Sequence, residues 1–179
     1  MRQILLDNIG HTLFVLLLIA RLADIGTTYL ATPTLNLEAN PVMRKLGWRF
    51  ALLTLVICII PYFSAEAGIM LLVPSLMVSA ANAGKIWAMR TMGEKDYRRM
   101  LLDLAARSTL RQAVSGVMAS ASFIILTGAV LLFFYPDPFG DYGFWFAMGI
   151  VAYGIVIAVH GRSWFIKIFK EVETGEEAK

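Results

Sequence analysis

Long apolar runs recur along this chain and restrict its fold more than any other feature. Each run is near the roughly 20 residues that an α-helix needs to cross a bilayer core of about 30 Å. Backbone within lipid must satisfy its own hydrogen bonds, so each run is expected to be helical. The sequence therefore predicts an all-α integral membrane bundle of five transmembrane helices in a single domain, 1–179, with spans near residues 9–31, 42–63, 67–89, 113–135 and 142–161.

The composition excludes an ordinary soluble domain. Hydrophobic residues make up 58% of the chain and charged residues only 16%, whereas soluble domains carry about 25% charged residues. The net charge of +3 comes from basic residues that flank the apolar runs, so the expected partner is the lipid bilayer and not nucleic acid. The single cysteine, Cys58, can form neither a disulfide nor a zinc cluster within one chain, and we expect no cofactor.

Lysine and arginine gather in alternate loops and predict the orientation. One side of the membrane receives Arg44, Lys45 and Arg49, then residues 90–111, then Arg162, Lys167 and Lys170. Basic loops are retained in the cytoplasm. We therefore expect the N-terminus outside and the C-terminus inside the cell (inner) membrane.

Residues 92–111 form a basic segment between the third and fourth spans. Met100, Leu101, Leu104 and Leu110 recur in it at helical spacing, among several arginines. This pattern predicts an amphipathic helix on the cytoplasmic membrane surface. A continuation of the neighbouring membrane helices into solvent is the alternative.

Polar residues interrupt the first and third spans at helical spacing. Arg21, Asp24 and Thr28 share one face of the first span, with Thr27 at its edge. Ser75, Ser79, Asn82 and Lys85 form a similar stripe in the third span. Both stripes lie in the cytoplasmic half, beside the loop that holds Glu38 and Asn40. The candidate ligand-binding or ion-binding residues are therefore Asp24, Thr27, Thr28, Glu38, Asn40, Asn82 and Lys85.

A plainer, structural interpretation remains open for each of these groups. Charged side chains within spans cost about 2.5–3.5 kcal/mol each and usually face a bundle interior or a cavity. Arg21 is the candidate counter-ion of Asp24, with Lys85 as the alternative, and such a pair could simply lock helices together. Asn40 and Pro41 suit the N-cap and first position of the next helix.

Other residues are weaker candidates for a functional site. His11 and His160 are expected near opposite membrane faces, so they make a poor metal pair, and His160 is interpreted as an interfacial residue or a partner of Tyr153. Ser115, Ala119 and Ser122 form a small-residue face in the fourth span, which is typical of close helix packing.

A motif in the first half of the chain resembles that of a known family. "DIGTT" at residues 24–28 and "EANP" at residues 38–41 are similar to the D-x-x-T-T … E-x-N-P signature of small, uncharacterised multi-pass membrane proteins of archaea and bacteria. The resemblance implies a prokaryotic inner-membrane protein and brings no known activity.

Three functions remain open on the sequence alone. The first is a cytoplasm-facing polar site around Asp24 that binds or conducts a cation, proton or small polar solute. The second is an accessory or assembly subunit of a larger membrane complex, or a homo-oligomer. The third is an intramembrane enzyme with Asp24 and Glu38 as acid and base. No hydrolase, metalloprotease or nucleotide-binding motif occurs, so no catalytic residue is assigned.

Overall fold

The structure is a computed structural model that describes residues 8–38, 40–139 and 141–174. These residues form helices joined by short connections and contain no strand, which confirms the all-α prediction. The helices are α2 (Ile9–Ala31), α3 (Pro41–Leu46), α4 (Trp48–Leu53), the 3₁₀-helix η1 (Thr54–Tyr62), α5 (Ala65–Met92), α6 (Glu94–Ala106), α7 (Leu110–Phe134) and α8 (Tyr142–Thr174).

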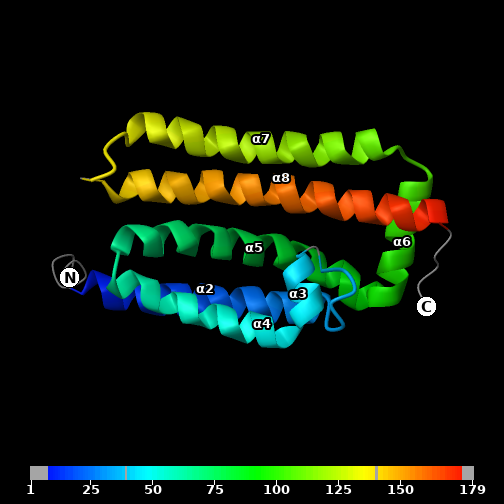
Figure 1. Cartoon of the computed structure of the whole chain (residues 1–179), viewed down its shortest axis with the longest axis horizontal. Helices are drawn as coiled ribbons and strands as arrows, with labels where there is room; N and C mark the ends of the chain where they lie inside the picture. The colour runs from blue at the N-terminus through cyan, green and yellow to red at the C-terminus, as the bar shows by residue number, and fades with distance from the viewer. Residues whose placement is uncertain (1–7, 39, 140, 175–179) are drawn as a thin grey trace.

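The long helices run antiparallel along one axis (Figure 1). α2, α5 and α8 run in one direction, while α4 with η1 and α7 run in the other. One end of the bundle carries the start of α2 and the turns before α5 and α8. The opposite end carries α3, α6 and the end of α8, and it is therefore the end at which the basic loops gather.

Four helices of the described chain are long and apolar enough to cross a membrane, namely α2, α5, α7 and α8. α2 has the same bounds as the predicted first span, 9–31. α5 and α7 lie within three residues of the predicted spans, 67–89 and 113–135. α8 continues thirteen residues beyond the predicted end at residue 161, because it runs on past the apolar run to pack against α6.

The segment predicted as the second span, 42–63, is not one continuous helix. Gly47 has a φ of +66° and separates α3 from α4, a left-handed backbone conformation that favours glycine. The apolar part that follows, Trp48–Tyr62, is shorter than the other four. Its second half is wound as the 3₁₀-helix η1. The predicted apolar segment is confirmed here, but the prediction of one continuous helix over residues 42–63 is wrong.

The basic segment predicted at 92–111 contains a separate helix. α6 lies across the end of the bundle (Figure 1), between Gly93 and the capping box that Thr109 and Gln112 form at the start of α7. Arg98 binds Glu171 of α8, with Nη2 2.9 Å from Oε2. A continuation of both neighbouring helices is therefore excluded, since α5 ends at Met92.

α7 and α8 pack closely because glycines line their contact. A Cβ atom added to Gly154 would lie 2.6 Å from Cγ1 of Ile125, and Gly128 is equally tight against Val151. Ala121 of α7 is buried in the same contact. The predicted small-residue face, Ser115, Ala119 and Ser122, is exposed and lies outside this contact. α7 thus uses a different face to pack on α8.

Candidate functional site

Asp24 sits in a network that joins two elements of the bundle. Arg21 is one turn earlier on α2, and its Nη1 lies 2.6 Å from Oδ2 of Asp24. The other end of the Arg21 guanidinium donates a hydrogen bond to Oγ1 of Thr54, 2.6 Å away on η1. Thr54 in turn donates to the carbonyl of Ala51. Arg21, and not Lys85, is therefore the ion-pair partner of Asp24.

The polar stripe of α5 faces α2. Nδ2 of Asn82 donates a hydrogen bond to Oγ1 of Thr28 over 3.0 Å. One turn earlier, Ser79 donates to the carbonyls of Ser75 and of Ala20, the latter on α2. These bonds satisfy polar groups between two apolar helices, as expected for helix contacts in a membrane.

The connection between α2 and α3 brings Glu38 to the same region. Oε1 of Glu38 accepts a hydrogen bond from the backbone N–H of Asn40, at 2.7 Å. Oδ1 of Asn40 accepts from the N–H groups of Val42 and Met43, so Asn40 is the N-cap of α3, as predicted. Pro41 follows at the first helical position. Capping and the Glu38 contact together determine how this loop enters α3.

Glu94, at the start of α6, holds the first part of the same loop. Its carboxylate accepts hydrogen bonds from the Thr32 hydroxyl and from the N–H groups of Thr34 and Asn36. Thr32 also accepts a bond from the N–H of Leu37, 3.2 Å away. The loop is therefore tied to a helix some sixty residues further along the chain.

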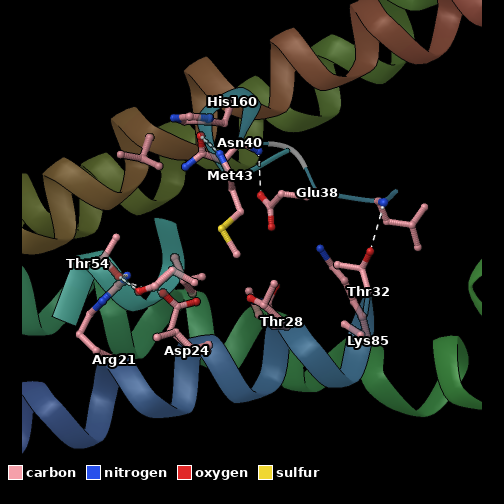
Figure 2. Close-up of a pocket in the computed structure, with 18 of the residues that line it drawn as sticks. Arg21, Asp24, Thr28, Thr32, Glu38, Asn40, Met43, Thr54, Lys85 and His160 are labelled. Atoms are coloured by element: carbon pink, nitrogen blue, oxygen red, sulfur yellow. Dashed lines mark hydrogen bonds and ion pairs between the residues drawn. The ribbon is translucent and has the colours of Figure 1, made fainter. Parts of the chain in front are cut away.

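These elements enclose a cavity of about 520 Å³ near the basic end of the bundle (Figure 2). Figure 2 shows Arg21, Asp24 and Thr54 at one end, Thr28 between, and Glu38, Thr32 and Lys85 at the other. Of the predicted candidates, the structure brings these to the cavity wall: Asp24, Thr28, Glu38, Asn40, Asn82 and Lys85, together with Arg21.

Thr27 is the one candidate that does not line the cavity. Its hydroxyl donates a hydrogen bond to the backbone carbonyl of Asp24, 3.1 Å away. Successive residues on a helix point about 100° apart. Thr27 therefore points away from the direction of Thr28, which lines the cavity. The Thr27 hydroxyl therefore forms its hydrogen bond within α2 and not with the cavity.

Lys85 is a cavity-lining cation without an ion-pair partner among the described residues. It is exposed, and the described part of the chain offers it neither a hydrogen bond nor a carboxylate within 4.0 Å. Glu38 shares the cavity but forms no ion pair with it. A carboxylate and an ammonium group, neither with an ion-pair partner among the described residues, thus line one cavity.

Sequence reasoning missed several lining residues. His160 and Tyr153 of α8 face the cavity, as do Thr32 and Thr54. The seven-residue spacing of Tyr153 and His160 placed them on one face, but not against α2 and α5. Thr54 could have been predicted, because it is a lone hydroxyl in an apolar run. No pattern in the neighbouring sequence predicted the hydrogen bonds that Glu94 accepts.

The cavity has the size and lining of a small-molecule site. The described residues contain no group of three or more His, Cys, Asp or Glu side chains placed to hold a metal ion. The cavity volume falls in the range of about 300–1,000 Å³ typical of small-molecule sites, and its wall is mostly apolar with a few charged groups.

The described residues form an all-helical chain with four helices of membrane-spanning length and a cavity near one end whose apolar wall carries several charged and polar groups. Several apolar helices of this length are typical of multi-pass membrane proteins. Comparison with protein families, curated proteins and solved structures found no match to this chain.

Proposed function

We propose that this chain is a multi-pass inner-membrane protein that binds a small polar ligand in the cavity around Asp24. The observation that carries the proposal is the shared cavity of Asp24, Glu38, Asn82 and Lys85, which come from three separate segments. Polar and charged groups within membrane spans are costly and mark functional sites. A purely structural ion pair between Arg21 and Asp24 would require neither Glu38 nor Lys85 beside it.

Binding is favoured over conduction by the packing of α2. Leu17 and Ala20, the turn of α2 before Arg21, are both 0% exposed. Cys58 of η1 is 1% exposed. The described residues therefore close the cavity on the side away from the basic end, and a conducted ion would need these side chains to move.

The proposed orientation places the cavity on the cytoplasmic side, with the N-terminus outside and the C-terminus inside. The support is the gathering of basic residues at the end that carries α3 and α6. Trp48–Tyr62 would be a short fifth crossing. Because a 3₁₀-helix rises about 2.0 Å per residue, α4 and η1 together extend roughly 27 Å, close to the thickness of a thin bilayer core.

The test is ligand-dependent stabilisation of the purified protein. Thermal unfolding would be followed in detergent with a panel of probes: sodium, potassium, magnesium, ammonium, glycine and phospholipids. A ligand present at about 100 times its Kd should stabilise the wild type by about 2.7 kcal/mol. Asp24→Asn and Glu38→Gln should each lose most of that shift, while Asp103→Asn, on an exposed part of α6, should keep it.

Two results would overturn the proposal. One is that no probe stabilises the wild type more than the Asp24→Asn variant. The other is that both cavity variants fold and retain the full shift. Because Gln can still accept the Asn40 bond, Glu38→Gln keeps the test informative if Asp24→Asn fails to fold.

An accessory subunit of a larger membrane complex, or a homo-oligomer, is the second candidate. The exposed small-residue face of α7, formed by Ser115, Ala119 and Ser122, favours it. Such faces let helices from different chains approach closely. Purification from native membranes in mild detergent tests it, since a stable larger assembly is expected and a lone monomer would contradict it.

A further inference from the structure

The cavity opens sideways between two walls that do not pack on each other. α8 packs mainly on α5, α6 and α7, whereas η1 packs on α2 and α5, and α4 packs on α3 and η1. Figure 1 shows α8 and α4 on opposite sides of α5. Val156 of α8 and Ala81 of α5 line the cavity and are exposed. The opening therefore lies between α8, which is long enough to cross a membrane, and the shorter apolar stretch Trp48–Tyr62, so we expect lipid beside it.

Among the described residues that line the cavity, one anion and one cation have no ion-pair partner. The Asp24 carboxylate is neutralised by Arg21 at 2.6 Å. Glu38 has one oxygen engaged by the N–H of Asn40. Lys85 has no partner within the described ranges. A ligand that carries both charges would satisfy Glu38 and Lys85 at once, whereas a simple anion or cation would satisfy only one of them.

Much of the remaining wall is apolar. Ile25, Met43, Phe50, Val78 and Ile157 line the cavity beside the charged groups. Apolar side chains at a lateral opening favour a ligand with an attached hydrocarbon part, because burying that part removes apolar surface from water. A free zwitterion has no hydrocarbon part to bury.

Resting on the proposed function, we infer that the cavity binds the zwitterionic headgroup of a membrane lipid. Its phosphate would accept from the Lys85 ammonium, and its amine would donate to the Glu38 carboxylate. The acyl chains would leave through the opening between α4 and α8. The same headgroup chemistry is also available as free phosphoethanolamine, so the source must be distinguished by experiment.

Lipid titration of the detergent-purified full chain provides the test. Phosphatidylethanolamine, phosphatidylglycerol or free phosphoethanolamine is added to micelles, and the thermal unfolding midpoint is measured. Phosphatidylethanolamine should reach its half-maximal effect at a concentration roughly tenfold lower than phosphatidylglycerol. Lys85→Met and Glu38→Gln should each abolish this preference. Lys95→Met and Glu173→Gln, at exposed positions outside the cavity, should preserve it.

Equal effects of the two lipids, an unchanged preference in both cavity variants, or equal protection by free phosphoethanolamine would each overturn the inference. The proposed function would survive these outcomes if another probe still stabilised the wild type more than Asp24→Asn. If no probe does so, the proposed function fails together with the lipid assignment.

Discussion

Arg21 and Asp24 form an ion pair one turn apart on α2, with Nη1 2.6 Å from Oδ2, and both side chains are about 15% exposed. Replacing Arg21 with Met should leave the Asp24 carboxylate unpaired in a largely desolvated place. We expect this to cost about 3 kcal/mol, at the lower end of the values for breaking a buried pair. Chemical or thermal unfolding in detergent measures the loss.

Arg99 and Asp96 supply the matched control for that experiment. They form an ion pair at the same three-residue spacing, but their side chains are 77% and 62% exposed. Arg99→Met should therefore cost less than about 1 kcal/mol. Equal losses in the two variants would show that burial does not make the Arg21 pair special.

Glu94 should control the mobility of the loop that carries Glu38. Glu94→Ala removes the acceptor for the N–H groups of Thr34 and Asn36. Hydrogen bonds to charged groups contribute about 1.5–3 kcal/mol, so amide exchange at these two positions should accelerate roughly tenfold or more. Hydrogen exchange with mass spectrometry measures it. Glu173→Ala, which removes an exposed carboxylate from α8, should leave exchange there unchanged.

The contact between α7 and α8 should not tolerate a large side chain at Gly154. Its neighbours across the contact include the backbone carbonyl of Ala121 and the N atom of Ile125, both 3.2 Å from an added Cβ. Gly154→Leu should therefore destabilise the fold by about 1–3 kcal/mol through overpacking. Gly84→Leu is the control, since nothing lies within 4 Å of its added Cβ. Similar unfolding midpoints for both variants would contradict the close packing.

The orientation can be tested by cysteine labelling in intact bacterial cells. In a Cys58→Ser background, Asp137→Cys should react with an impermeant maleimide, because the loop before α8 is expected outside. Ser108→Cys, in the turn between α6 and α7, should react only after the cells are opened. The reverse pattern would place the cavity on the outer side and refute the proposed topology.

Much of the helix layout could be predicted because membrane thickness and helix rise together determine the length of an apolar run. The same geometry placed Asp24, Thr28, Asn82 and Lys85 at one depth, and spacings of three and four residues placed them on shared faces. The break at Gly47 was harder to predict, since the chain does not show which glycine will adopt a positive φ.

The remaining site residues could not be predicted because they depend on which helices become neighbours. His160 reaches the cavity only because α8 packs on α5. Glu94 binds Thr32, Thr34 and Asn36 across some sixty residues of sequence. Neither contact could be predicted from the spacing or composition of the neighbouring sequence.

The most direct test of the binding proposal is a crystal structure of the full chain grown from a lipidic mesophase containing phosphatidylethanolamine. We predict non-protein density in the cavity, within hydrogen-bond distance of Glu38 or Lys85. The Asp24→Asn variant, crystallised in the same way, should show weaker density or none. A cavity filled only by water in the wild type, or collapsed onto its own side chains, would contradict the claim that it binds a polar ligand.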